Sequence, residues 1–236
     1  MKKKTWILAT LTVAASLQLG MAADITGKVT LKGTPPPEKP IDALKNDPNC
    51  GKLVKDKEVP KTRFYLVGDK GQLADVIVSI KGIPGKSTGA QAKPHLLDQV
   101  NCEYVPYVSA VQTDQKILVR NSDPVFHNVH PTPKVQGNNE ANKAQMPKAP
   151  DLEFTFTKPE ELLRFKCDVH PWMFAYVSVF DHPYFSVTGT DGTFTIQNVP
   201  PGKYTLEFNH RKAGVVTKEI EVKDSNVTVD AELEVK

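Results

Sequence analysis

Short runs of β-branched and aromatic residues, separated by Gly, Pro, Asn and Asp, follow one another along almost the whole chain. Within these runs apolar and polar residues alternate, which is the period of a strand with one buried face, and no long segment has the 3.6-residue period of a helix. We therefore expect an all-β protein. The runs that predict strands are residues 25–32, 74–81, 107–112, 116–120, 152–157, 162–167, 175–180, 193–197, 203–209, 214–222 and 226–235.

The first residues have the pattern of a secretory signal peptide. Three lysines at 2–4 precede an apolar stretch that ends near residue 19, and small residues follow. We expect cleavage after Ala22 or Ala23 and a soluble periplasmic or secreted product, since no later segment is apolar enough to span a bilayer. Without the three leader lysines, basic and acidic residues balance at 27 each. This balance indicates neither nucleic acid nor an acidic membrane surface as a partner.

Four side chains of the kind that bind copper occur in two separate segments. Cys167, His170 and Met173 stand three residues apart, and His127 ends the segment Asn-Ser-Asp-Pro-Val-Phe-His upstream. One thiolate, two imidazoles and a weak axial thioether form the donor set of a redox-active copper. A single tight loop can present the first three side chains to one ion if His127 arrives from a neighbouring strand. The sequence therefore predicts a site for one copper ion.

The strand pattern around these residues is consistent with such a site. Alternation up to Cys167 places its side chain on the core face, where a thiolate is costly unless a cation neutralises it. Copper deprotonates a coordinating thiol outright. The alternation resumes after the loop, at 175–179, which predicts an antiparallel hairpin that holds the loop. We expect the turn before His127 to fix that ring, and Asn128 to bridge the two ligand segments by hydrogen bonds.

Two other interpretations of these residues stay open. Zinc also binds Cys and His, although Met is a poor zinc ligand and closed zinc sites prefer more thiolates or histidines. The second interpretation is that the chain is a small β-sandwich with a buried free thiol, and that its histidines form no metal site. We expect His130 to lie on the face opposite His127, in a structural or exposed position, and His182 to form a hydrogen bond at a domain junction. A second metal site that includes these residues or His210 has no support in the sequence.

Cys50 and Cys102 remain after the copper loop is assigned. Because an exported chain can form disulfides, and both residues lie in Pro- and Asn-rich connecting segments, we expect them to pair. Two unpaired buried thiols are the alternative.

Two long segments, 34–60 and 131–150, have the composition of loops. The second either covers the flank of the metal site or is a mobile excursion, which is the interpretation we favour from its composition.

The two ligand segments, Phe-His-Asn-Val-His at 126–130 and Cys-Asp-Val-His-Pro-Trp-Met at 167–173, resemble the ligand motifs of cupredoxins, the family of plastocyanin and amicyanin. The short loop is most similar to that of amicyanin. Over residues 73–181 the resemblance implies a Greek-key sandwich that holds type 1 copper. It implies His127, Cys167 and His170 as equatorial ligands and Met173 as the axial ligand. Phe126 departs from the Pro that those relatives commonly have before the first ligand, which affects the detail of the loop and leaves the donors unchanged.

The C-terminal segment changes character near residues 182–185. The segments 190–196 and 198–206, with the turns Asp191-Gly192 and Pro200-Pro201-Gly202, resemble carboxypeptidase regulatory-like domains, which are small transthyretin-like sandwiches. We expect each of the two turns to join a hairpin. The domains predicted are a signal peptide at 1–22, an N-terminal strand and loop segment at 23–72, a cupredoxin domain at 73–183 and a second sandwich at 184–236. Residues 25–29 resemble the first strand of that second sandwich, so the copper domain is expected to be inserted in it.

These observations predict a one-electron carrier whose partner is a periplasmic redox protein. His170 would be partly exposed at one end of the sandwich, beside a docking patch of Pro171, Trp172 and Phe174. The alternative for Trp172 and Phe174 is that they pack under the loop. Two other functions stay open: a copper carrier or buffer without redox turnover, and a carbohydrate- or protein-contacting module with structural copper. We expect no enzyme, since the sequence shows no phosphate loop, no nucleophile motif and no second histidine cluster.

Overall fold

The computed structural model describes residues 21–83 and 87–236. The predicted signal peptide therefore lies almost wholly outside the described residues. Within them the chain is all-β, as predicted, with two short helices, α1 (Asp42–Asn46) and α2 (Cys50–Leu53), and one 3-10 turn at Gly89–Gln91. None of the helices in this part of the chain is long and apolar enough to cross a membrane.

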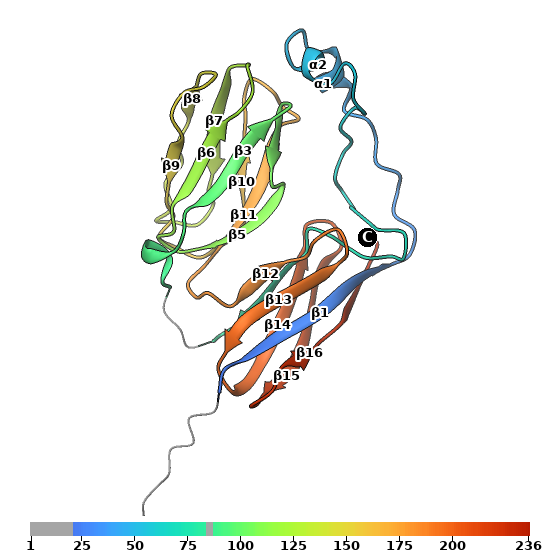
Figure 1. The fold of residues 1–236 in the computed structure, drawn as a ribbon, viewed down its shortest axis with the longest axis vertical. Coiled ribbons are helices and arrows are strands. Elements are labelled where there is room, and N and C mark those ends of the chain that lie inside the picture. The colour runs from blue at the N-terminus through green and yellow to red at the C-terminus, as the bar shows by residue number, and fades with distance from the viewer. Residues whose placement is uncertain (1–20, 84–86) are drawn as a thin grey trace, which may run out of the picture.

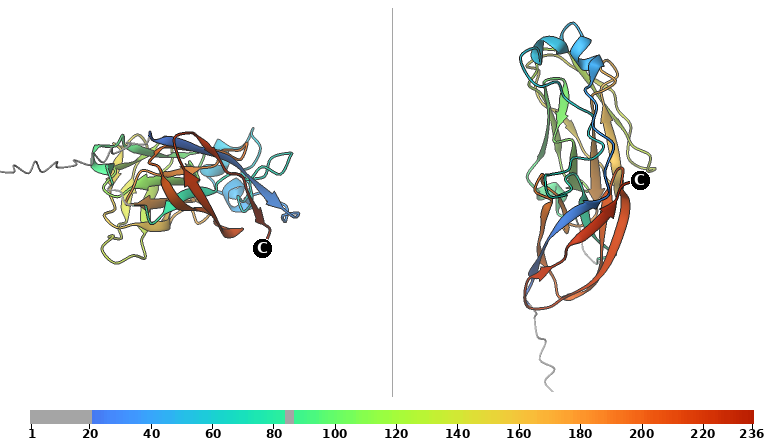
Figure 2. Two further views of the ribbon diagram at one scale, coloured as in Figure 1. Left: turned by 90° about the horizontal axis from the view of Figure 1, so that it is seen from below. Right: turned by 90° about the vertical axis from the view of Figure 1, so that its right-hand side faces the viewer.

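The strands form two β-sandwiches that lie end to end along the long axis of the molecule (Figures 1 and 2). The inserted sandwich contains β3 (His95–Val100), β4 (Glu103–Val105), β5 (Val108–Gln112), β6 (Ile117–Asn121), β7 (His127–Thr132), β8 (Lys143–Gln145), β9 (Leu152–Phe154), β10 (Glu160–Lys166) and β11 (Phe174–Phe180). Its two sheets have the strand orders β5-β11-β10-β7-β8 and β4-β3-β6-β9.

The second sandwich, here called the terminal sandwich, contains the first strands of the chain and all those after β11. They are β1 (Ala23–Lys32), β2 (Ile77–Lys81), β12 (Phe185–Val187), β13 (Thr193–Val199), β14 (Gly202–His210), β15 (Gly214–Val222), β16 (Val227–Thr228) and β17 (Ala231–Glu234). In one sheet β1 pairs with β13, β16 and β17, and the other sheet has the order β12-β2-β14-β15.

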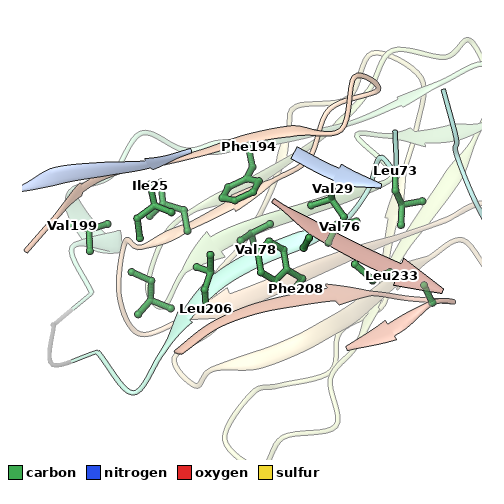
Figure 3. Packing of buried hydrophobic residues seen from close by; sticks show 14 of the residues in the cluster. Ile25, Val29, Leu73, Val76, Val78, Phe194, Val199, Leu206, Phe208 and Leu233 are labelled. Carbon is green, nitrogen blue, oxygen red and sulfur yellow. The ribbon is translucent and has the colours of Figure 1, made fainter. Parts of the chain in front are cut away.

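Alternating apolar side chains of the two sheets fill the core of the terminal sandwich (Figure 3). Ile25 and Val29 of β1 and Phe194 of β13 face Val78 of β2 and Phe208 of β14, and all five are buried. A strand that alternates in this way presents one apolar face to the opposite sheet. The first strand is therefore part of the same sandwich as the last six.

The structure differs from the predicted domain division at β2. The sequence pattern places residues 73–83 in the copper domain, whereas β2 pairs with β12 and β14 of the terminal sandwich. Val78 and Ile80 lie in the core of that sandwich. An apolar strand fits the core of either sandwich, so its local pattern does not tell which sheet it joins.

Two of the predicted hairpins are also different in the structure. Asp191-Gly192 forms the expected turn, with Gly192 at φ 72°, and Gly202 follows the expected Pro-Pro turn. However, β13 lies in one sheet of the terminal sandwich while β12 and β14 lie in the other. These turns therefore connect the two sheets and do not join hydrogen-bonded neighbours.

The segment between β1 and β2 was predicted to be a loop over 34–60, and it contains both α-helices. Its two arms pair with each other: the Ile41 N–H donates to the Pro60 carbonyl and the Thr62 N–H donates to the Lys39 carbonyl, both at 2.8 Å. We call residues 33–64 the strap and residues 41–54, which include α1 and α2, the cap. The cap lies at the end of the inserted sandwich that is remote from the terminal sandwich (Figure 1).

Candidate metal centre

The loop at 167–173 connects β10 to β11, which form the predicted antiparallel hairpin with Phe165 opposite Ala175. Two backbone hydrogen bonds close the loop. The Cys167 N–H donates to the Met173 carbonyl at 3.0 Å, and the Met173 N–H donates to the His170 carbonyl at 2.8 Å. The hairpin therefore holds Cys167, His170 and Met173 in one compact turn, as the spacing predicts.

His127, the first residue of β7, meets this loop in the core. Its Nδ1 is 3.0 Å from Nδ1 of His170, and Sγ of Cys167 is 3.6 Å from the same His170 atom. The exposed fractions of His127, Cys167 and His170 are 0, 2 and 3 %. The ligand atoms of these three residues all lie within 4.8 Å of one another. Met173 is buried in the same core cluster as Cys167.

The electrostatics of the cluster favour a thiolate. Burial alone would raise the pKa of Cys167, but hydrogen bonds from His127 and His170 lower it to about 6. Two Nδ1 atoms that face each other at 3.0 Å need a proton or a cation between them, because both cannot present lone pairs unopposed. The three donor atoms therefore converge on one buried point, which fits a bound metal ion.

Asp123 orients the ring of His127. Its carboxylate accepts a hydrogen bond from Nε2 of His127 at 3.0 Å, and backbone N–H groups of Asn101 and Cys102 donate to it at 2.6 and 2.8 Å. A carboxylate at Nε2 makes that atom the donor, which leaves the Nδ1 lone pair directed at the cluster. Burial would lower the pKa of His127, but hydrogen bonds to Asp123 and Cys167 raise it.

Asn128 links the two ligand segments, as the sequence analysis predicts. Its Oδ1 accepts a hydrogen bond from the backbone N–H of Asp168 at 2.8 Å and lies 3.3 Å from Sγ of Cys167. Its Nδ2 donates to the Asp168 carboxylate at 3.0 Å. Asn128 therefore ties the strand that carries His127 to the loop that carries the other donors.

The 131–150 segment covers one flank of the site. It contains β8, which pairs with β7 so that Gln145 lies opposite His127. The Asn142 side chain donates to Asp168 at 2.7 Å, and Glu140 bonds His130 at 2.6 Å. The structure therefore favours the alternative in which this segment covers the flank of the site over the mobile excursion expected from its composition.

The predicted partial exposure of His170 is wrong, because the cap covers this residue. Cys50 and Cys102 form the predicted disulfide, with an S–S distance of 2.06 Å, and this bond joins α2 to the inserted sandwich. A carboxylate oxygen of Asp47, the disulfide sulfur of Cys50 and a ring nitrogen of His170 lie within 4.8 Å of one another. The sequence could not show this cover, since the cap precedes the loop by more than a hundred residues.

The structure does not bring the three predicted docking residues together on one exposed surface. Pro171 is exposed, whereas Trp172 and Phe174 are half-buried. Trp172 Nε1 donates to the Cys102 carbonyl at 3.2 Å, and its ring centroid is 5.2 Å from that of His170. Trp172 thus packs against the cap and the ring of His170. This position is nearer to the alternative interpretation, packing under the loop, than to an exposed docking patch.

The three other histidines that the sequence analysis set aside have structural contacts. His130 forms hydrogen bonds with Asp168 and Glu140. His182 accepts a hydrogen bond from the Tyr184 N–H at 3.1 Å, at the junction of the sandwiches as expected. His210 accepts one from the Ala213 N–H at 3.0 Å. Asp123 is the site residue that the sequence analysis missed, because Asp123-Pro124 was interpreted only as a turn.

A family model, described as the BOS complex subunit NOMO1-like second β-sandwich domain, matches residues 184–236. This match confirms a β-sandwich in the C-terminal segment, while the resemblance to carboxypeptidase regulatory-like domains stays a prediction. No curated protein matches the chain.

Among solved structures, similarity extends to a copper-containing nitrite reductase from Thermus scotoductus, with 20 % identity over 43 % of this chain and 25 % of that chain, at a TM-score of 0.34. The Cu(I) form of a point mutant of amicyanin shows 19 % identity over 43 % of this chain and 97 % of its own, at a TM-score of 0.33. The chain thus covers a quarter of the nitrite reductase and nearly all of amicyanin. At these TM-scores the similarities carry no argument about this protein.

Proposed function

We propose that this protein binds one copper ion through His127, Cys167, His170 and Met173 and carries single electrons outside the cytoplasm. The observation that carries the proposal is the convergence of two imidazole Nδ1 atoms and one thiol on a single buried point. Copper in such a set supplies a one-electron couple. The predicted signal peptide and the disulfide support a periplasmic or secreted location.

The donor chemistry supports copper over zinc. The cluster has one thiol, where closed zinc sites prefer more thiolates or histidines. The fourth candidate donor, Met173, is a soft thioether that suits copper and is a poor zinc ligand. Its backbone is held in the loop by the hydrogen bonds to Cys167 and His170.

The surroundings support an ion that stays in place while its charge changes. Asp123 holds His127 through one hydrogen bond, and backbone N–H groups of Asn101 and Cys102 anchor Asp123 in turn. Asn128 holds Asp168 of the ligand loop through two more. A rigid ligand frame reduces the change of geometry between the two oxidation states. We expect the cap over His170 to slow exchange of the ion, which favours a resident cofactor over a carrier that passes copper on.

The test is an absorption spectrum of purified protein loaded with one equivalent of Cu(II). We expect an intense thiolate-to-copper charge-transfer band in the visible region, which Cys167→Ser abolishes. Met173→Leu should shift the band and retain it. A stoichiometrically loaded protein without this band would refute the proposal, and a far-UV circular dichroism spectrum of Cys167→Ser equal to that of the wild type is the control for folding of the variant.

A further inference from the structure

A cleft of about 400 Å³ lies between the strap and the inserted sandwich, next to the candidate metal centre. Sites for small molecules commonly enclose roughly 300–1,000 Å³. The strap contributes Ala43 and Phe64 to the walls, and the inserted sandwich contributes Glu103, Tyr107, Trp172 and Phe174. The proposed function uses none of these cleft walls.

Five of the twelve residues that line the cleft are aromatic, and its four charged residues are two acidic and two basic. Phe174 and Tyr107 pack against each other with ring centroids 5.8 Å apart. The Arg63 guanidinium lies 4.9 Å from the centre of the Tyr107 ring. Its Nη2 pairs with Asp75 at 3.1 Å, which compensates its charge, while its buried Nε has no hydrogen-bond partner in the described part of the chain. Flat rings bind planar aromatic molecules by stacking and by burial of apolar area. The cleft therefore favours a planar aromatic ligand without a net charge.

Two carboxylates line the cleft, Asp42 and Glu103, and Asp42 is exposed to solvent. Glu103 is half-buried, and within residues 21–83 and 87–236 no donor forms a hydrogen bond to its carboxylate. Burial raises the pKa of this carboxyl, and the nearby Arg63 lowers it in part. A carboxylate in an apolar cleft is stabilised by a hydroxyl donor, and such a bond to a charged acceptor is stronger than a neutral one.

We propose that the cleft binds a small phenolic molecule of the hydroquinone class, with its ring against the aromatic walls and its hydroxyl donating to Glu103. Trp172 separates the cleft from His170, since its ring contacts both. A ligand here would lie one side chain away from a residue of the candidate metal centre. The binding of this ligand does not depend on the proposed function.

The test is isothermal titration calorimetry of copper-free protein with 1,4-hydroquinone under anaerobic conditions. We expect saturable one-to-one binding at or below about 1 mM. The matched probe is 1,4-dimethoxybenzene, which has the same ring and no hydroxyl donor. It should bind at least about tenfold more weakly, because Glu103 is then left without a partner.

Variants locate the binding. Ala43→Trp, at an exposed position of the cleft wall, should abolish the titration signal, while Val215→Trp, exposed on the terminal sandwich, should leave it unchanged. Glu103→Met should remove the difference between the two probes. The proposal is overturned by absence of binding at millimolar hydroquinone or by unchanged binding in Ala43→Trp. Because the protein is free of copper, these outcomes are independent of the copper spectrum.

Discussion

At the scale of single residues, the position of one proton decides what the candidate centre can bind. The Asp123 carboxylate at Nε2 of His127 makes Nε2 the protonated nitrogen, so Nδ1 faces Cys167 and His170 with a free lone pair. Backbone N–H groups of Asn101 and Cys102 hold that carboxylate in turn. The ligand geometry therefore depends on a residue four positions before His127 that binds no metal itself.

Replacing Asp123 with Asn tests this dependence. The amide has nearly the same shape but lacks the charge that holds the proton on Nε2, so more of the His127 rings will carry it on Nδ1, where it opposes metal binding. We expect Cu(I) affinity to fall about 10- to 100-fold, measured by competition with bicinchoninate. Asp114→Asn, at an exposed turn, is the matched control and should keep wild-type affinity. Equal affinities of the two variants would contradict the role given to Asp123.

His210 should make folding sensitive to pH. Burial lowers its pKa to about 4, and it accepts a hydrogen bond from the Ala213 N–H. The unfolded chain, with an ordinary pKa near 6.5, takes up the proton first. The contribution of His210 to the free energy of unfolding is therefore fully present above about pH 6.5. It is lost as the pH falls toward 4, and amounts to on the order of 3 kcal/mol.

The measurement for His210 is urea unfolding of copper-free protein between about pH 7.5 and 4.5, the window set by the two pKa values. His210→Asn keeps an acceptor for the turn and removes the titrating ring, so its free energy of unfolding should fall less over this range. A decline as steep as that of the wild type would show that other groups cause the loss.

At the scale of elements, the local sequence pattern predicts the hairpin that holds the ligand loop but does not predict the cap over His170. The alternation of β10 and β11 is local information, and both strands form with Cys167 on the core face as expected. The ranges of β3 and β7 are not among the predicted strands, because polar residues and Pro131 interrupt the alternation of their sequences. The cap covers His170 through a disulfide and apolar contacts between distant segments, which no short-range pattern records.

Freeing the cap should speed exchange of the ion. In Cys50→Ser/Cys102→Ser the tether between α2 and the inserted sandwich is lost, and the closed cap loses about 2–4 kcal/mol of stabilisation. Local opening over His170 then becomes more frequent. We expect loss of Cu(II) to excess EDTA, followed by decay of the visible band, to accelerate on the order of a hundredfold. A far-UV circular dichroism spectrum at the assay temperature checks that the variant is folded, and an unchanged rate would argue against the cap as a barrier.

At the scale of the whole molecule, the chain enters the terminal sandwich twice before it forms the inserted one. β1 and β2 belong to the terminal sandwich, β3–β11 form the inserted sandwich, and β12–β17 complete the first. The sequence predicts the insertion but places its start before β2. The sheet that β2 joins is decided by pairing with β14, far along the chain, and the local pattern of β2 does not show this pairing. An apolar cluster that includes Ile77 of β2 and Val108 of β5 packs between the two sandwiches.

Two separate cores predict two unfolding transitions. Leu233 is fully buried in the terminal sandwich and Phe165 in the inserted one, so truncation of either to Ala removes contacts from one core only. Such truncations cost about 2–5 kcal/mol. Leu233→Ala should lower one transition in calorimetry and keep the copper charge-transfer band, whereas Phe165→Ala should lower the other transition and release copper at a lower temperature. Loss of the band at the same temperature in both variants would mean that the cluster at Ile77 couples the sandwiches into a single cooperative unit.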